Sequence, residues 1–182
     1  SSAVLGCLFV AYTGHWIDVH WDFLTDPMLQ NDDARTSLFP FHRYASEPSL
    51  VDDPIATEML AFVPHAVRAL YAAVVPFCDV MVAPKIVQAL CLGIVFWAGF
   101  ALARSRPGGF AAGIVLVFFL LHTHFMVNRI AGGLPRAFAF PCMALWCAGV
   151  VGNHERRRWM ACILAALTYP SAAAILLAAE GI

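Results

Sequence analysis

Apolar stretches of helical length alternate with short polar turns along most of the chain. The stretches cover residues 3–17, 86–103, 110–127, 137–151 and 159–179. A helix needs about 20 mostly apolar residues to cross the roughly 30 Å hydrocarbon layer of a bilayer. Most of these stretches approach that length without a charged residue at their centre. The pattern predicts an all-α membrane protein, residues 1–182 forming a single transmembrane domain of about five helices.

The first and last stretches differ from the others. Residues 3–17 are short for a membrane span, and Pro170 lies inside the last stretch, where it is expected to kink the helix because proline removes a backbone hydrogen bond. The chain starts at Ser1 without a Met, and its final residues still belong to an apolar run. We therefore expect a fragment of a longer protein.

A long polar excursion, residues 18–83, separates the first stretch from the second and carries most of the acidic residues. Apolar positions within residues 56–75 recur at spacings of three and four, which is typical of amphipathic helices at a membrane interface. Pro64 should divide this run into two helices. Another helix is predicted around residues 34–46, since the excursion has too many Leu, Phe and Tyr side chains for a disordered acidic loop.

Composition supports a membrane environment and excludes one class of partner. The chain is 61% hydrophobic and 13% charged, which is more apolar than a soluble domain with a single core. The net charge of -1 argues against nucleic-acid binding, which requires a clustered basic face. The six cysteines include no CxxC pair, so we expect buried free thiols.

Arginines in two short turns predict the orientation in the membrane. Arg104 and Arg106 follow the second stretch, and residues 156–158, all arginine, precede the fifth. Positive charge in short loops favours the cytoplasm. The N-terminus should then be cytoplasmic, and the excursion should face the opposite side. Arg129 and Arg136 would lie on that outer side, against the rule.

Two acidic pairs in the excursion are candidates for chemistry. Asp32-Asp33 and Asp52-Asp53 flank a segment that contains Arg35, His42 and Arg43. Such carboxylates can act as a general base or bind Mg²⁺ or Mn²⁺ through oxygen. They can equally be solvated charges or helix caps.

The motif HWIDVHWD, residues 15–22, lies at the end of the first stretch. On a helix, His15, Asp18 and Asp22 would share one face, which permits a metal site. Tryptophans at a membrane boundary are, however, an ordinary aromatic belt. We favour the belt and keep Asp18 as a secondary candidate for a catalytic acid.

Two longer strings carry a resemblance to a known class. They are QNDDARTSLFPFHRYASEPSLVDDPIATEM with the following RALYAAVVPFCDVMVAPKIVQAL, and GGLPRAFAFP at residues 132–141. Over roughly residues 28–150 the chain resembles the N-terminal part of bacterial multi-spanning GT-C glycosyltransferases. The resemblance lies in the order and spacing of these features rather than in one short motif.

The resemblance implies a function and a location. GT-C enzymes transfer a sugar from a polyprenyl-phosphate donor on the outer face of the membrane and use an acidic residue in the first outer loop. Here that residue would be Asp32 or Asp33, acting as general base or as ligand for Mg²⁺ or Mn²⁺. The protein would lie in a bacterial inner membrane with its active face towards the periplasm. The chain is much shorter than a complete enzyme of this class.

The Gly-Gly loop, residues 132–136, is the expected donor site. Arginine can bind a lipid-linked phosphate bidentately, and glycines allow the backbone to approach it closely. We therefore expect Arg35, Arg129 and Arg136 to contact the substrate. The arginines could equally extend to lipid headgroups without a catalytic role.

Two functions remain for comparison with the structure. The first is a membrane glycosyltransferase-like protein whose partners are the lipid bilayer and a lipid-linked sugar donor. The second is a non-catalytic membrane subunit that packs against other membrane subunits in a larger complex. The enzyme requires Asp32 or Asp33 and Arg136 to converge on one groove, whereas the subunit does not.

Overall fold

The computed structural model describes residues 2–29, 36–45, 49–104, 108–122, 130 and 132–181. Within these residues every regular element is a helix and none is a strand, so the prediction of an all-α chain is confirmed. The helices before the second long one are α1 (Ser2–Val19), α2 (Trp21–Thr25), η1 (Phe39–Tyr44), α4 (Pro54–Ala61), α5 (His65–Val74) and η2 (Val75–Phe77). The remaining helices are α6 (Ala83–Ala103), α7 (Gly109–His122), η3 (Pro135–Phe138), α9 (Ala139–Val151), α10 (Glu155–Thr168) and α11 (Pro170–Glu180).

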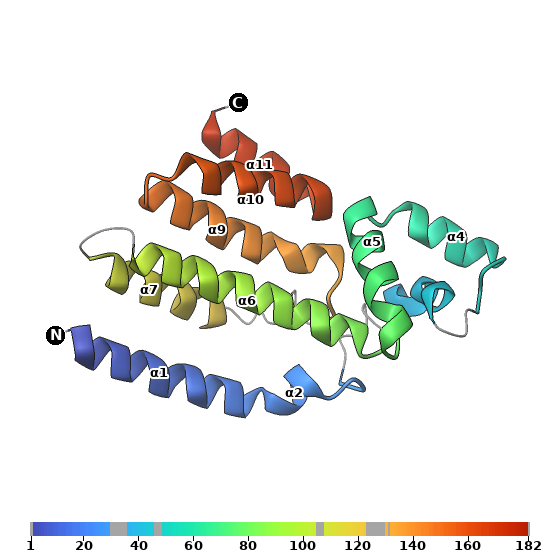
Figure 1. Cartoon of the computed structure of the whole chain (residues 1–182), viewed down its shortest axis with the longest axis horizontal. Helices are drawn as coiled ribbons and strands as arrows, with labels where there is room; N and C mark the ends of the chain where they lie inside the picture. The colour runs from blue at the N-terminus through green and yellow to red at the C-terminus, as the bar shows by residue number, and fades with distance from the viewer. Residues whose placement is uncertain are drawn as a thin grey trace.

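Helix α6 lies at the centre of a bundle whose long helices run side by side (Figure 1). It packs against α7 on one side and α9 on the other, while α1 packs on α7 and α10 packs on α9. Among the described residues, α6 is the one helix that is long and apolar enough to cross a bilayer, judged by length and composition alone. The prediction of five spans stays a prediction, because the other apolar helices are shorter.

Two glycines allow α6 and α7 to approach each other closely. A Cβ atom on Gly99 would lie 2.4 Å from Cγ2 of Val117, and one on Gly113 would lie 2.4 Å from the carbonyl oxygen of Gly99. Neither helix could keep this separation with a larger residue at the crossing. Small residues serve here as they do in membrane helix pairs, where close backbone approach strengthens packing.

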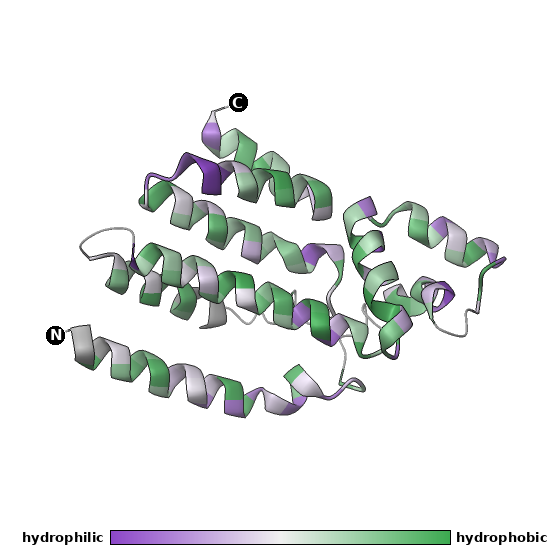
Figure 2. Cartoon of the chain, viewed as in Figure 1, coloured by the Kyte–Doolittle hydropathy of each residue, from purple (hydrophilic) through white to green (hydrophobic). Residues whose placement is uncertain are grey.

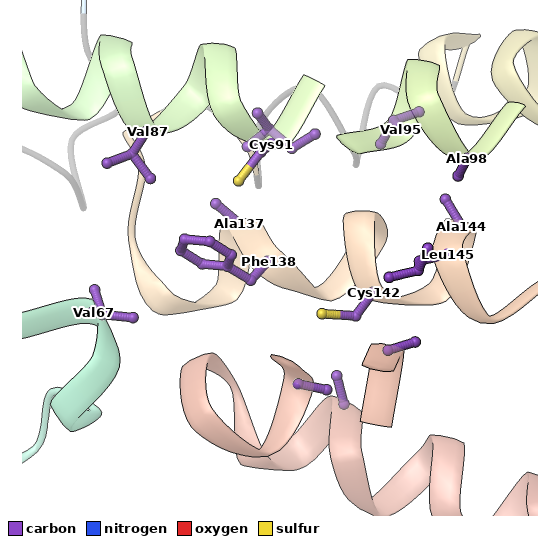
Figure 3. Close-up of a cluster of buried hydrophobic side chains, with 14 of the residues drawn as sticks. Val67, Val87, Cys91, Val95, Ala98, Ala137, Phe138, Cys142, Ala144 and Leu145 are labelled. Atoms are coloured by element: carbon purple, nitrogen blue, oxygen red, sulfur yellow. The ribbon is translucent and has the colours of Figure 1, made fainter. Parts of the chain in front are cut away.

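The core between α6, α9 and α10 is built from small and medium side chains. Val87, Cys91, Val95 and Ala98 of α6 face Cys142 and its neighbours on α9 (Figure 3). Ala161, Cys162 and Ala165 of α10 complete this layer. All six cysteines are free thiols, and three are buried. The thiols therefore pack as small apolar groups.

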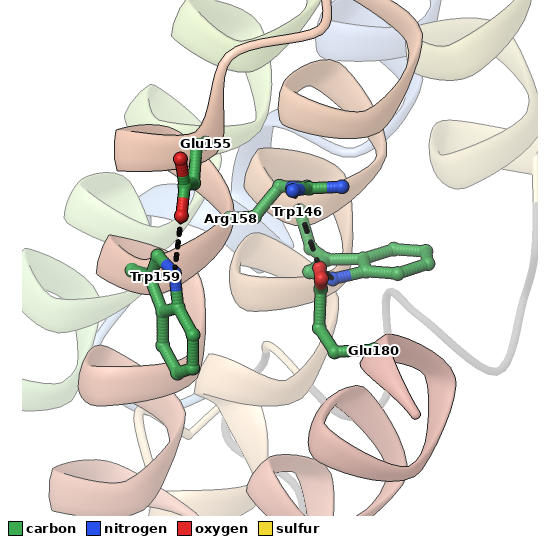
Figure 4. Close-up of polar contacts among 5 residues, drawn as sticks. All are labelled: Trp146, Glu155, Arg158, Trp159 and Glu180. Carbon is green, nitrogen blue, oxygen red and sulfur yellow. Dashed lines mark hydrogen bonds and ion pairs between the residues drawn. The ribbon is translucent and has the colours of Figure 1, made fainter. Parts of the chain in front are cut away.

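The expected single span over residues 159–179 is wrong in its geometry. Helix α10 ends at Thr168 and α11 begins at Pro170, with Tyr169 between them at φ −148° and ψ 84°. The chain reverses direction at Tyr169. The contact between Glu180 at the end of α11 and Arg158 at the start of α10 demonstrates this reversal (Figure 4). In one straight helix these residues would be about 33 Å apart. Pro170 thus starts a second antiparallel helix instead of kinking one long helix.

The excursion folds into a helical unit at one end of the bundle (Figure 1). Helices α4 and α5 are separated at Phe62–Pro64, so the predicted division at Pro64 is confirmed. Asp53 caps α4 by accepting a hydrogen bond of 2.7 Å from the backbone N–H of Ala56, and Pro54 occupies the first helical position. This arrangement satisfies one of the unpaired N–H groups at the helix start.

The helix predicted around residues 34–46 is mainly a 3-10 helix. Element η1 covers Phe39–Tyr44, with Pro40 at its start, and a helical turn at 36–38 precedes it. Residues 34, 35 and 46 lie outside the described part of the chain. A proline here fixes φ and removes an N–H donor, which favours a short element over a long α-helix.

The helices of the bundle consist mostly of hydrophobic residues (Figure 2). Large exposed hydrophobic side chains lie on α6, α10 and α11, and they include Leu90, Trp97, Phe100, Met160, Ile163, Leu167 and Ile175. Water-soluble monomers rarely expose such extensive apolar surface. The exposed face of these helices is therefore more apolar than is usual for a water-soluble monomer.

Candidate functional site

A cavity of about 550 Å³ lies where the excursion meets the bundle. We call it the outer cavity. It is lined by Ser37, Pro40, Phe41, Met59, Phe62, Val63, Val67, Tyr71, Leu134, Pro135, Arg136 and Tyr169. These residues come from η1, from α4 and α5, from the Gly-Gly loop and from the turn between α10 and α11. The cavity exists only because four distant parts of the sequence meet.

Tyr71 fixes one wall of the outer cavity. Its ring stacks on Phe41 with centroids 4.1 Å apart and an interplanar angle of 15°. Its hydroxyl donates to the carbonyl oxygen of Gly133 at 3.3 Å and lies 3.5 Å from that of Gly132. Burial raises the pKa of this hydroxyl well above its usual value, so it stays a proton donor. One side chain thus joins η1, α5 and the Gly-Gly loop.

The Gly-Gly loop needs its glycines for both conformation and space. Gly132 has φ 104° and Gly133 has φ 60°, in the left-handed region that residues with a Cβ avoid. A Cβ on Gly133 would also lie 2.8 Å from the Tyr71 hydroxyl and 3.0 Å from Cα of Pro84. The loop is therefore held tightly against α5 and the start of α6.

Arg136 is the cation that lines the outer cavity. It lies in η3, directly after Pro135, and its side chain is half-buried. Pro135 begins η3, and the backbone of Leu134 before it is extended. This sharp change of direction brings residues 134–136 to the cavity while Ala137 and Phe138 enter the core.

The turn between α10 and α11 supplies Tyr169 to the same cavity. The reversal at Tyr169 is the reason why a residue so late in the sequence reaches the excursion. Phe62, which also lines the cavity, is 86% exposed. An aromatic side chain in that position can contact a lipid or an apolar ligand at the cavity mouth.

Lys85 connects the start of the excursion to α6. Its Nζ donates to the carbonyl oxygens of Phe23 at 2.6 Å and Leu29 at 2.8 Å, and it lies 5.1 Å from the centre of the Phe23 ring. The side chain is 8% exposed. This buried ammonium holds residues 23–29 on α6, immediately before the Asp32-Asp33 pair in the sequence.

Of the predicted site residues, the structure describes Arg136. Asp32, Asp33, Arg35 and Arg129 lie outside the described residues, so whether they approach Arg136 stays a prediction. Ser37, which lines the outer cavity, follows Arg35 by two positions in the sequence.

The other acidic candidates have structural roles or no assembled site. Asp53 is a helix cap, as described above. Within HWIDVHWD, Trp16 is buried and stacks on His20, whose Nδ1 contacts the carbonyl oxygen of Trp16 at 2.8 Å. In the part of the chain that the structure describes, no three His, Cys, Asp or Glu side chains come together as metal ligands.

Sequence reasoning did not identify Tyr71, Phe62 or Tyr169 as cavity residues. Two signals were present: Leu70-Tyr71 forms part of the string that resembles GT-C proteins, and Tyr169 directly precedes Pro170. Neither signal indicates a cavity without the chain reversal and the packing of α5 on the Gly-Gly loop.

Known proteins give no match to this chain, whether it is compared with models of protein families, with curated sequences or with solved structures.

Proposed function

We propose that this chain is an integral membrane protein of the GT-C type, with about five membrane-crossing helices, that binds a lipid-phosphate-linked sugar in the outer cavity. The observation that carries the proposal is the position of Arg136 in a cavity whose other walls are largely apolar and aromatic. A polyprenyl-phosphate sugar has matching chemistry, because it joins a long apolar chain to an anionic phosphate.

The membrane part of the proposal rests on the bundle exterior. Helix α6 has the length and composition of a span, and large apolar side chains cover neighbouring helices. Buried in a bilayer, this surface would contact acyl chains instead of water. The outer cavity would then lie near the headgroup region, with the excursion above it, in a bacterial inner membrane with the cavity towards the periplasm.

The proposed chemistry assigns one role to Arg136 and one to the acidic pair. Asp32 or Asp33 takes the proton from the acceptor hydroxyl, whose oxygen forms a bond to the anomeric carbon of the sugar. The bond from that carbon to the phosphate oxygen breaks, and the phosphate leaves with the electron pair. Arg136 stabilises the negative charge that develops on the leaving group.

Photo-crosslinking tests binding at the cavity. The chain in detergent micelles would be irradiated with a benzophenone-bearing polyprenyl phosphate, with undecaprenyl phosphate and undecaprenol as competitors. We expect competition by the phosphate but not the alcohol, and a loss of about tenfold in labelling for Arg136→Gln. Arg68→Gln, on α5 and outside the cavity lining, is the matched control. Equal labelling of the two variants would refute the assignment of Arg136.

Transfer assays test the acidic pair. In membranes that contain the protein, Asp32→Asn and Asp33→Asn would be measured separately, because an amide keeps the shape of the carboxylate but cannot accept the proton. Glu58→Gln, on the exposed side of α4, is the control. We expect one Asp variant to lose transfer at an unchanged protein level. Full activity in both variants would leave the non-catalytic membrane subunit as the better hypothesis.

A further inference from the structure

We propose that the opposite end of the bundle holds a second ligand site, which binds the phosphate of an anionic phospholipid. The site is a shallow pocket of about 250 Å³ lined by Trp97, Phe100, Ala101, Arg104, His154 and Arg157. We call it the arginine pocket. The inference uses the membrane setting of the proposed function but does not depend on the outer cavity.

Two arginines reach the arginine pocket from turns that are far apart in the sequence. Arg104 ends α6, and Arg157 lies in the first turn of α10. The guanidinium carbon of Arg104 lies 5.4 Å from the centre of the Phe100 ring, and that of Arg157 lies 6.0 Å from the centre of the Trp97 ring. Stacking on an aromatic face orients a guanidinium and leaves its N–H groups at the edge available to an acceptor.

A glycine in α9 makes this convergence possible. A Cβ on Gly149 would lie 2.7 Å from Cγ of Arg158 and 3.2 Å from Cβ of Arg157. Asn153 adopts φ 53°, and the N–H of His154 donates to the carbonyl oxygen of Gly149 at 2.7 Å. This tight turn sets the start of α10 directly on the end of α9, so that Arg157 extends to α6.

The acidic side chains nearest in sequence to this turn are engaged elsewhere. Glu180 accepts from Trp146 at 2.7 Å and pairs with Arg158 at 3.5 Å, and Glu155 accepts from Trp159 at 3.3 Å (Figure 4). Within the described residues, neither Arg104 nor Arg157 forms an ion pair with a carboxylate. The pocket therefore gathers positive charge without an internal anion.

The start of α10 adds to this positive charge. His154, the N-cap residue of this 14-residue helix, lines the pocket and makes no side-chain capping hydrogen bond, so the positive end of the helix dipole lies beside the pocket. Helix N-termini favour anions. The aromatic walls formed by Trp97 and Phe100 are 47% and 57% exposed, and they suit the glycerol and upper acyl carbons of a lipid. Basic pockets between membrane helices bind anionic headgroups in this manner.

Native mass spectrometry of the chain in detergent micelles tests the site. Dioleoyl phosphatidylglycerol would be titrated against dioleoyl phosphatidylcholine, which carries the same acyl chains and no net charge. We expect about 30-fold tighter binding of the anionic lipid, because each of the two arginines near the headgroup contributes about 1 kcal/mol. The double variant Arg104→Gln, Arg157→Gln should bind both lipids equally.

Matched variants separate the pocket from general positive charge. Arg156→Gln removes the same charge from the same turn at an exposed residue outside the pocket lining, and it should keep the preference. The proposed function is tested separately, at Arg136 with a polyprenyl phosphate, so its failure would not affect this result. Equal loss in Arg156→Gln and in the double variant would overturn the site.

Two further arms keep the result clear. The double variant Arg104→Lys, Arg157→Lys keeps the charge and the fold but loses the planar guanidinium groups that bind phosphate bidentately. We therefore expect the preference for the anionic lipid to fall a few-fold. An unchanged preference in both the Lys and the Gln double variants would overturn the proposal. Inorganic phosphate at the lipid concentration should not displace the lipid; displacement would assign the site to free phosphate and overturn the lipid assignment.

Discussion

The indole Nε1 of Trp146 donates to Oε1 of Glu180 at 2.7 Å across 34 residues of sequence. Glu180 is also 3.5 Å from Nε of Arg158, so one carboxylate joins the ends of α9, α10 and α11. This relationship establishes that α11 doubles back along α10, and it determines where Tyr169 and the outer cavity lie.

Breaking this contact should loosen the hairpin of α10 and α11. Glu180→Gln removes the charge from a carboxylate whose side chain is 13% exposed, and we expect a loss of about 1–3 kcal/mol in unfolding free energy. Arg158→Gln should cost less, because Trp146 still donates a charge-assisted hydrogen bond to the Glu180 carboxylate, whereas in Glu180→Gln that bond becomes a weaker neutral one. A double-mutant cycle measured by thermal unfolding in detergent should give a coupling energy above zero. Additive effects would contradict the ion pair.

Tyr71→Phe should weaken the attachment of the Gly-Gly loop. The ring and its stacking on Phe41 remain, but the carbonyl oxygen of Gly133 loses its buried donor, at a cost of about 1–2 kcal/mol. Tyr44→Phe is the control, since the Tyr44 hydroxyl makes no hydrogen bond to another residue that the structure describes. The unfolding midpoints of both variants check the prediction, and equal midpoints would refute it.

The same residue predicts a dependence on pH. Burial raises the pKa of Tyr71 above its usual value of about 10, so the folded state keeps the proton after the unfolded state has lost it. Its contribution is complete below pH 10 and declines as the pH rises further. The stability difference between the wild type and Tyr71→Phe should therefore shrink as the pH rises from 10 to about 11. Thermal unfolding over this pH range measures the difference, and a constant difference would contradict the prediction.

Two glycines of α6 give a matched test of helix packing. Gly99→Ala places a methyl group against Val117 of α7 and should lower the unfolding free energy by about 1–3 kcal/mol. Gly93→Ala faces open space and should be neutral or stabilising by about 0.5–1 kcal/mol, because alanine favours a helix. Thermal unfolding of both variants, compared with the wild type, checks the difference in sign. Equal destabilisation would contradict the close crossing.

Asp52 and Asp53 are neighbours in the sequence, but replacing them should affect the stability of the protein differently. Asp53→Ala removes the cap of α4 and should cost about 1 kcal/mol. Asp52 is exposed, and its replacement by alanine should change stability little. Proteolysis within residues 49–61 should accelerate in the Asp53 variant. If Asp53→Ala left stability unchanged while abolishing sugar transfer, Asp53 would be a catalytic residue instead of a cap.

Cysteine labelling checks the proposed orientation. Single cysteines would be introduced at the solvent-exposed positions Ser49 and Arg156 in a variant that lacks Cys7 and Cys78. Intact cells would then be treated with a membrane-impermeant maleimide. We expect labelling at Ser49, in the excursion, and none at Arg156 until the membrane is opened. The reverse pattern would place the excursion in the cytoplasm and exclude the proposed outer site.

The hydrophobic pattern by itself determined which segments are helices. Residues 89–103 and 139–151 are apolar without interruption, and Pro64 and Pro170 each remove a backbone donor, so local chemistry was enough to place these helices and the breaks at the prolines. The cap at Asp53 also follows from a local pattern, an acidic residue directly before Pro54.

Only the tertiary structure decided what those breaks do. A proline can kink a helix or start a new one, and the contact of Glu180 with Arg158 selects the second outcome. The meeting of Tyr71 with Gly133, and of Arg104 with Arg157 at one pocket, likewise depends on how helices pack. Sequence spacing fixes neighbours within about one helical turn, whereas contacts across 62 residues, such as that of Tyr71 with Gly133, depend on the shapes of all the side chains between them.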